Sequence, residues 1–134
     1  MSNGLLLDTN IISHLVRQPA GCAAQQLREH METRCCTSII VACELRFGAE
    51  KSGSALLSER IDQILSKIEV LPLCTPVEHH YARLREALQR AGTPIGPNDM
   101  LIAAHALAHD LTLITDNVDE FLRVDGLRVE NWIR

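Results

Sequence analysis

The sequence predicts an α/β fold in which helices cover both faces of a parallel sheet. Short apolar runs alternate with longer amphipathic segments along the chain, which favours strand–helix units. The runs at the two clearest strand positions are nearly continuous, as is typical of strands buried on both faces. Aromatic residues make up only 3% of the chain, so Leu, Ile, Val and Ala must build the core.

The first strand–helix unit is predicted at the start of the chain. Three leucines follow a glycine in the strand predicted at 4–7. Thr9 or Asn10 is expected to cap the helix over 11–18, because either side chain can accept a hydrogen bond from a free backbone N–H group. Pro19 then ends this helix, since proline cannot continue it.

The second unit begins with a polar segment over 23–34, which is expected to be helical. It leads into a short strand at 35–38. Ser38 can cap the following helix over 39–51, and Gly53 is a stop signal because glycine adopts the left-handed conformation of a helix end.

A third unit extends to the middle of the chain. The helix predicted over 55–68 carries apolar residues at helical spacing on one face. These are Leu56, Leu57, Ile61, Ile64, Leu65 and Ile68. A strand is predicted at 69–73, and Pro76 then starts a helix over 77–92 that ends at Gly92.

The last part of the chain contains the most apolar predicted helix. A loop at 93–99 opens this helix, which covers 99–110 and is expected to be central. A fourth buried strand is predicted at 111–115. An acidic turn at 116–121 and an edge strand at 126–130 complete the pattern.

Composition limits the class of protein. No apolar run approaches the roughly 20 residues of a membrane span, and no signal peptide opens the chain. The five cysteines lack CxxC spacing, so they are expected to be small buried side chains in a reducing cytoplasm. The net charge is −4, whereas a nucleic-acid binder is usually basic, so any such function must account for this acidity.

Carboxylates gather at the predicted carboxyl ends of the strands, where ligand sites form in parallel sheets. Asp8 directly follows the first strand and Asp116 follows the fourth. Glu44 lies about two turns into the helix after the second strand, and Asp99 lies in the first turn of the central helix. No lysine or arginine is near Asp8 in sequence, although a buried carboxylate needs a cationic partner. Such oxygen ligands suit Mg²⁺ or Mn²⁺, which assist attack of water on a phosphodiester.

Each carboxylate also has an ordinary structural explanation. Asp8 can be a helix cap, and Asp99 suits the positive end of a helix dipole. Residues 116–121 can be a solvated turn. The prediction of a metal site therefore depends on the carboxylates occurring together.

Three segments of the chain, taken in their order along the sequence, carry a family pattern. They are LLLDTNIISHL, TSIIVACELRFGAEKS and GTPIGPNDMLIAAHALAHDLTLITDNVDEFLRVDGLRVENW. Together they resemble the PIN-domain ribonucleases, and most of all the toxins of bacterial VapBC toxin–antitoxin systems. The resemblance implies a single PIN domain over 1–134, with a three-layer α/β/α fold around a parallel sheet of about five strands. It also implies endoribonuclease activity that depends on Mg²⁺ or Mn²⁺.

The resemblance also implies the site residues. The metal-binding acidic residues of the family fall, by position, on Asp8, Glu44 and Asp99. At the fourth acidic position many members carry Asp where this chain has Asn117. Asp116 or Glu120 is left to supply that charge, and Glu120 is favoured as a contact to a metal ligand or to the metal's water. Asn10 and Thr115 are expected to orient Asp8 by hydrogen bonds.

Several partners follow from the same resemblance. The family implies a homodimer, a VapB-type antitoxin that blocks the pocket, and an RNA substrate, with transfer RNA favoured over ribosomal RNA. The bound metal would offset the acidity of the site toward RNA. A basic rim is expected to contact the RNA backbone. Its candidate residues are Arg46, Lys51, Arg83, Arg85 and Arg90.

Three other functions are less well supported by the residues. His105 and His109 have zinc-ligand spacing, but the glutamate of an HExxH motif is absent. A phosphatase with an aspartate nucleophile requires a second Asp where Asn10 stands. A PIN-fold module that binds RNA or an antitoxin without cleavage is the remaining alternative, and the presence of Asp8, Glu44 and Asp99 argues against it.

Overall fold

The computed structural model describes residues 2–134, and the strands within them form one five-stranded parallel sheet. The strands are β1 (Leu5–Leu7), β2 (Cys35–Ser38), β3 (Glu69–Leu71), β4 (Thr112–Ile114) and β5 (Val129–Glu130). Their order is β3-β2-β1-β4-β5, and each neighbouring pair is parallel. The predicted parallel sheet is therefore confirmed.

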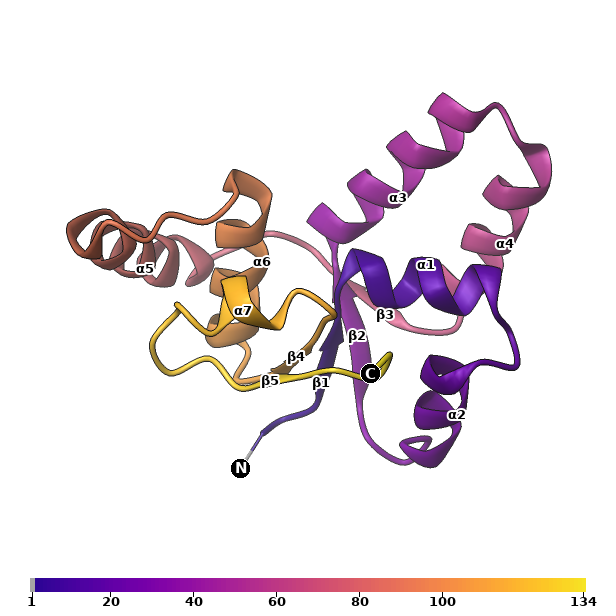
Figure 1. The fold of residues 1–134 in the computed structure, drawn as a ribbon, viewed down its shortest axis with the longest axis horizontal. Helices are drawn as coiled ribbons and strands as arrows, with labels where there is room; N and C mark the ends of the chain where they lie inside the picture. The colour runs from indigo at the N-terminus through magenta and orange to yellow at the C-terminus, as the bar shows by residue number, and fades with distance from the viewer. Residues whose placement is uncertain (1) are drawn as a thin grey trace.

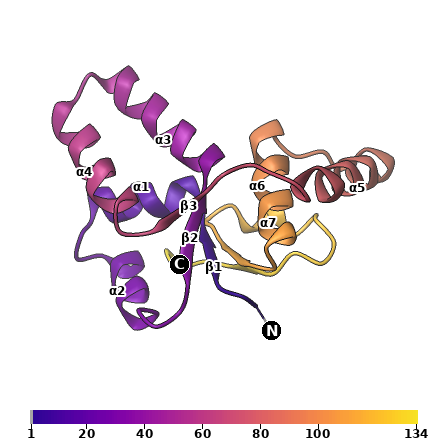
Figure 2. The same cartoon turned by 180° about the vertical axis from the view of Figure 1, so that it is seen from behind.

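Helices cover both faces of this sheet. In both views, α1 to α4 lie on one side of the sheet and α5 to α7 lie on the other (Figure 1, Figure 2). The helices are α1 (Thr9–Arg17), α2 (Cys22–Glu29), α3 (Ile39–Ser52), α4 (Ala55–Leu65), α5 (Val77–Ala91), α6 (Pro97–Ala108) and α7 (Val118–Phe121). This three-layer α/β/α arrangement confirms the predicted fold class. Within residues 2–134, no helix combines the length and apolar character needed to cross a lipid bilayer.

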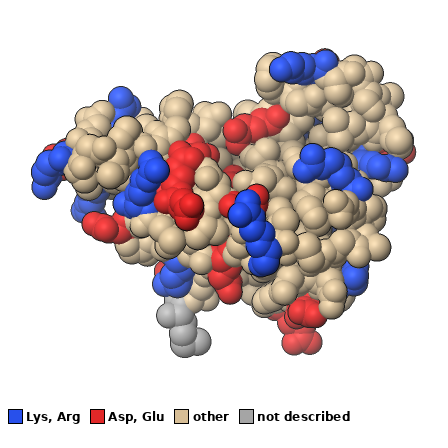
Figure 3. Space-filling view, in the orientation of Figure 1, with Lys and Arg blue, Asp and Glu red and all other residues tan. Residues whose placement is uncertain are grey.

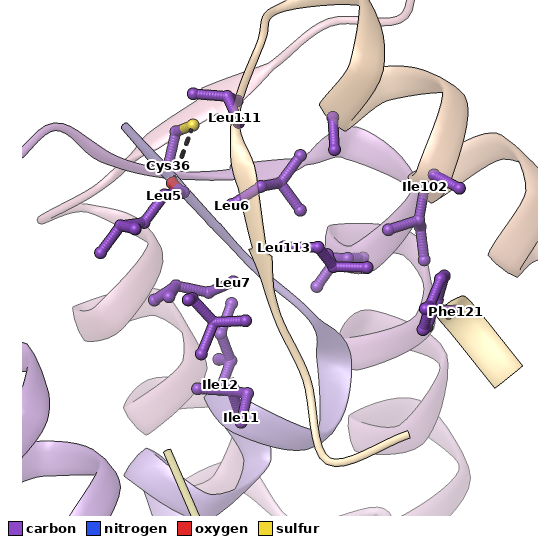
Figure 4. Close-up of a cluster of buried hydrophobic side chains, with 14 of the residues drawn as sticks. Leu5, Leu6, Leu7, Ile11, Ile12, Cys36, Ile102, Leu111, Leu113 and Phe121 are labelled. Atoms are coloured by element: carbon purple, nitrogen blue, oxygen red, sulfur yellow. Dashed lines mark hydrogen bonds between the residues drawn. The ribbon is translucent and has the colours of Figure 1, made fainter. Parts of the chain in front are cut away.

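The central strand β1 and the apolar helix α6 form the middle of the core (Figure 4). Leu6 and Leu7 have no exposed surface, and neither does Ile102 of α6. Burial of each such side chain stabilises the fold by about 1.5–3 kcal/mol. The prediction that the apolar helix is central is confirmed.

Two helix ends follow their predicted local signals, and a third does not. The Ser38 hydroxyl accepts a hydrogen bond from the Ile40 N–H group at 3.0 Å and caps α3, while Gly53 ends that helix with φ of 67°. The cap of α1 is Asp8, not Thr9 or Asn10. The prediction was wrong because only Asp8 separates the end of β1 at Leu7 from the start of α1 at Thr9.

Other boundaries also differ from the sequence prediction. The central helix begins at Pro97, two residues earlier than predicted, because proline is well suited to the first helical position. The acidic turn contains the short helix α7. Leu56, predicted on the buried stripe of α4, is 56% exposed, whereas Ile61 is buried.

The strand order explains where the site forms. The chain places β2 and β3 on one side of β1, then returns to place β4 and β5 on the other side. The direction of strand addition therefore reverses between β1 and β4. Ligand sites in open parallel sheets form beyond the carboxyl ends of the strands at such a point.

Candidate active site

Asp8 lies at this reversal point and is only 4% exposed. Its backbone N–H group continues the sheet by donating to the Ile114 carbonyl at 2.9 Å. Asp8 Oδ2 accepts hydrogen bonds from Thr115 Oγ1 at 2.7 Å and from Asn10 Nδ2 at 3.3 Å. Asp8 Oδ1 accepts from the Thr9 N–H group at 2.8 Å. The carboxylate is thus held in one orientation by groups on both adjoining segments.

The Thr115 hydroxyl connects these groups. Its single hydrogen is donated to Asp8, so its oxygen acts only as an acceptor toward its other neighbours. It accepts from Asn10 Nδ2 at 3.3 Å and from the Asn117 N–H group at 3.0 Å. Asn10 Oδ1 in turn accepts from the Asp116 N–H group at 2.9 Å. This network ties the start of α1 to the segment that follows β4, so the position of Asp8 depends on residues more than 100 positions away.

Glu44 is brought beside Asp8 by α3. Its side chain is half-buried, and its Oε1 accepts a hydrogen bond from Thr9 Oγ1 at 2.6 Å. Thr9 was expected to cap the helix and to help orient Asp8, but its contact with Glu44 was not predicted. No local signal reveals it, because Thr9 and Glu44 are 35 positions apart.

Asp99 and Glu120 form a second pair of carboxylates next to Asp8. Asp99 lies in the first turn of α6 and shares a hydrogen bond with Glu120, which lies on α7. Glu120 also accepts from the Gly96 N–H group at 2.7 Å and from Asn117 Nδ2. A Cβ atom at Gly96 would lie 3.6 Å from Asp99 Oδ2 and 3.7 Å from Glu120 Oε1, so both carboxylates pack against this residue.

The pKa values show that these carboxylates act on one another. Burial is the main factor that raises the pKa of Asp8, and the negative charges of Glu44 and Glu120 add to it. The hydrogen bonds from Thr115 and Thr9 oppose this rise. Asp8 is therefore held in a place that disfavours its ionised form.

The Asp99–Glu120 pair shares its charge unequally. Burial, followed by the hydrogen bond to Glu120 and its charge, raises the pKa of Asp99 to about 7. Burial also acts to raise the pKa of Glu120, but hydrogen bonds from Gly96, Asn117 and Asp99 outweigh it and lower that pKa. A proton between the two carboxylates is therefore held on Asp99.

The carboxylates of this cluster have no ion-pair partner among the described residues, although the charge of Arg123 acts on Glu120. Among residues 2–134, no Lys, Arg or His forms an ion pair with Asp8, Glu44, Asp99 or Glu120. Nor do any three His, Cys, Asp or Glu side chains in that range converge closely enough to hold a metal ion as they stand. The available oxygen donors nevertheless suit a hard cation such as Mg²⁺ or Mn²⁺ in chemical type, and its charge would relieve their mutual repulsion.

Asp116 differs from these carboxylates. Its Oδ1 accepts from Asn131 Nδ2 at 3.0 Å and lies 2.8 Å from Arg134 Nε. The hydrogen bond from Asn131 is the largest factor that lowers the pKa of Asp116, and Arg134 adds to it. Its charge is thus balanced by the C-terminal segment.

The residues of the predicted basic rim differ in whether a neighbouring side chain already binds them. Arg46 and Arg90 each form an ion pair with a nearby carboxylate, and Arg85 donates to a tyrosine hydroxyl one turn earlier in α5. Lys51 and Arg83 are exposed and form no ion pair within residues 2–134. Their contacts with RNA stay predictions.

His105 on α6 and His109, which follows the end of this helix, lie side by side without forming a metal site among the residues described. The rings of His105 and His109 lie 5.3 Å apart. His105 is fully buried, with its Nδ1 2.8 Å from the Ser38 hydroxyl. The part of the chain that the structure describes supplies no third ligand that would make this pair a zinc site.

The fold and the carboxylates Asp8, Glu44, Asp99 and Glu120, which together form what we call the acidic pocket, define a PIN-type domain, and the PIN domain family matches residues 5–127. The chain is 37% identical to the tRNA(fMet)-specific endonuclease VapC of Salmonella typhimurium, over 95% of this chain and 96% of that protein. It is 35% identical to ribonuclease VapC2 of Rickettsia felis, with 95% and 96% covered. The crystal structure of VapBC2 from Rickettsia felis bound to a promoter DNA fragment aligns with a TM-score of 0.89 and 32% identity, over 96% of this chain and 98% of that chain. This chain therefore belongs to the PIN domain family and, within it, to the VapC ribonucleases, which confirms the predicted class of enzyme.

Proposed function

We propose that this protein is the toxin of a toxin–antitoxin pair and hydrolyses phosphodiester bonds of transfer RNA with the help of Mg²⁺ or Mn²⁺. The observation that carries the proposal is the group of carboxylates that meets at the end of β1 and β4 without a cationic partner among the described residues. The endonuclease of Salmonella typhimurium named above, specific for tRNA(fMet), supports the choice of RNA.

Asp8 and Asp99 are the proposed metal ligands, and Glu44 either binds the metal or orients its water. Glu120 takes the fourth acidic position, because it lies beside Asp99 whereas Asp116 is paired with Arg134. When bound, the cation would lower the pKa of water and stabilise the leaving oxygen of the phosphodiester. Thr115 and Asn10 hold the Asp8 carboxylate in place, which limits the reorientation that metal binding requires.

The antitoxin is proposed to act on the same charges. An arginine inserted into the pocket would form charge-assisted hydrogen bonds with carboxylates that have no cation of their own. Phe47 on α3 and Leu56 on α4 are 68% and 56% exposed, so they offer apolar area to such a partner. A homodimer and a single domain over 1–134 complete the proposed assembly. All five cysteines are free, in keeping with action in a reducing cytoplasm. Cys22, Cys43 and Cys74 are exposed, however, so the prediction that the cysteines are buried was wrong for these three.

The test is cleavage of end-labelled bulk transfer RNA by purified protein. We expect cleavage in Mg²⁺ and none in EDTA. Glu44→Gln should reduce the rate by about tenfold or more, and the matched change Glu59→Gln, at an exposed position of α4, should have no effect. Binding of RNA without cleavage under all conditions would instead identify a binding-only module.

A further inference from the structure

A cavity lies near the acidic pocket, on the side toward α5. It has a volume of about 420 Å³ and is bounded by α5, α6 and the chain that follows α7. Its floor is aliphatic and comes from Leu84, Leu88, Leu107 and Val124. This volume is within the range of about 300–1,000 Å³ that is typical of sites for small organic groups.

The rim of this cavity is positively charged. Arg83 and Arg123 lie at its edge with His80, and Asp125 is its only acidic residue. Within residues 2–134, neither guanidinium is paired with a carboxylate. Five other arginines are so paired: Arg34, Arg46, Arg90, Arg128 and Arg134. Arg83 is therefore free to bind an anion. Arg123 can do so with the guanidinium atoms that do not donate to Pro94, although its charge also acts on Glu120.

The cavity and the acidic pocket share a wall, the segment 93–96. Thr93 lines the cavity, and the Gly96 N–H group donates to Glu120 in the acidic pocket. Arg123 donates from Nη1 to the Pro94 carbonyl at 2.9 Å, which fixes this guanidinium at the wall. Basic side chains accordingly lie beside acidic ones over α6 and α7, on the side toward α5 (Figure 3).

An aliphatic floor with a guanidinium rim matches the chemistry of a nucleotide. Proteins that read single-stranded RNA hold unstacked bases against apolar or guanidinium surfaces and contact the phosphates with cations. The segment 93–96 joins the two features, so an RNA strand that crosses it would meet both the carboxylates and the cavity. An acidic peptide would satisfy the rim, but its acidic side chains would leave the aliphatic floor without a matching group.

We propose that this cavity is a nucleotide subsite, in which one unstacked base of the RNA substrate lies on the aliphatic floor while Arg83 and Arg123 contact the phosphates beside it. The inference rests on the RNA substrate proposed above. It adds the place at which the protein holds a nucleotide next to the cleaved bond. It gives the acidic protein a local basic surface for its substrate.

Filling the cavity tests the contact with the base. Ala87 lines the cavity from an exposed position of α5, so Ala87→Trp would occupy the space of the base. Ala82→Trp is the matched control, because Ala82 is exposed on the same helix and does not line the cavity. Binding of fluorescein-labelled bulk transfer RNA is measured by anisotropy in EDTA, where no cleavage occurs. Ala87→Trp should weaken binding about tenfold or more, and Ala82→Trp should not.

Removing a rim charge tests the contact with phosphate. Arg83→Gln should make the plot of log Kd against log salt shallower by about 0.7 to 1, as expected for one lost phosphate contact. Arg60→Gln is the matched control, since Arg60 is exposed on α4 with no ion pair among the described residues. Thermal unfolding of each variant verifies that it is folded.

The outcomes separate this subsite from the proposed cleavage activity. Pocket-dependent RNA binding without Mg²⁺-dependent cleavage would support the subsite and overturn the proposed function. Cleavage and RNA binding that are unchanged in folded Ala87→Trp and Arg83→Gln would overturn the subsite alone, and so would an absence of RNA binding by the unmodified protein. Weaker binding of a labelled hexaglutamate peptide by Ala87→Trp, with unchanged RNA affinity, would reassign the cavity to an acidic peptide and overturn the proposal.

Discussion

Asp8 and Asp116 follow neighbouring strands of one sheet, but their charges are balanced in opposite ways. Asp8 is buried at the end of β1 and receives only neutral hydrogen-bond donors, from Thr115, Asn10 and Thr9. Asp116 follows β4 and is paired with Arg134 at the surface. Fold position alone therefore does not decide which carboxylate remains available to an external cation.

The difference between the two aspartates comes from their neighbours on other elements. Asp8 lies near Glu44 and Glu120, whose charges add to the effect of burial and raise its pKa. Asp116 is reached by the C-terminal segment, whose Asn131 lowers its pKa by hydrogen bonding. A site for a cation thus requires both a carboxylate and the absence of an arginine or lysine that forms an ion pair with it.

The largest expected effect is on cleavage when the two aspartates are changed separately. Asp8→Asn should reduce the rate of RNA cleavage by more than about 100-fold, because even the groups that orient a metal ligand contribute ten- to hundredfold. Asp116→Asn should leave the rate within about threefold, since its charge is already offset by Arg134. Rates are measured with end-labelled transfer RNA in Mg²⁺.

Antitoxin binding serves as a control for these two variants. If both variants are folded and still form the complex, a loss confined to Asp8→Asn separates catalysis from partner recognition. Equal losses in both variants, or full activity of Asp8→Asn, would contradict the assigned metal site.

Thr115 provides the next test, because it donates to Asp8 and accepts from Asn117 and Asn10. Thr115→Val removes the hydroxyl but keeps a similar shape, so we expect about a 10- to 100-fold lower cleavage rate. The buried groups that lose their partner should also cost about 1–3 kcal/mol of unfolding free energy. Thr115→Ser restores the hydroxyl and should recover most of the rate. A variant Thr115→Ser as slow as Thr115→Val would show that the methyl group, not the hydroxyl, matters.

Much of the fold was predictable because its signals are local. Ser38 caps α3 and Gly92 ends α5, with φ of 71°, as the residue types indicate. The predicted parallel sheet depends on continuous apolar strands, whose pattern is visible in the sequence. The helix α7 was missed because its four residues are too few to show a helical period.

The site was predictable only in part. The rule about strand ends pointed to Asp8, but the contact of Thr9 with Glu44 joins elements 35 positions apart. The choice between Asp116 and Glu120 depends on Asn131 and Arg134, far along the chain. Such choices are set by tertiary packing, which no short pattern in the sequence encodes.

A smaller effect is expected on stability as a function of pH in EDTA. The folded-state pKa of Asp8 lies above the model-peptide value of 3.8, so its ionised form destabilises the metal-free fold as the pH rises above that value. Asp8→Asn should therefore raise the Tm at pH 7.5 by a few degrees, and the gain should shrink as the pH falls toward 4. Tm is measured by differential scanning calorimetry.

Asp116 should show the opposite sign in the same experiment. Its folded-state pKa lies below 3.8, so its ionised form stabilises the fold above that pH, and this contribution is lost as the pH falls. Asp116→Asn should lower the Tm slightly at pH 7.5 and have no effect at the acidic end. Shifts of the same sign in both variants would contradict the contrast between the two strand ends.

The smallest effect should come from Arg134, which balances Asp116 at the surface. Its side chain is 76% exposed, so Arg134→Gln should change the unfolding free energy by less than about 1 kcal/mol. The cleavage rate should also be unchanged. The charge of Asp116 would lose its partner, but it lies outside the acidic pocket. If Arg134→Gln instead changes the Mg²⁺ concentration needed for half-maximal cleavage, the charge of Asp116 reaches the metal site. Asp116 would then share the fourth acidic position with Glu120, and the separation between the ends of β1 and β4 would no longer hold.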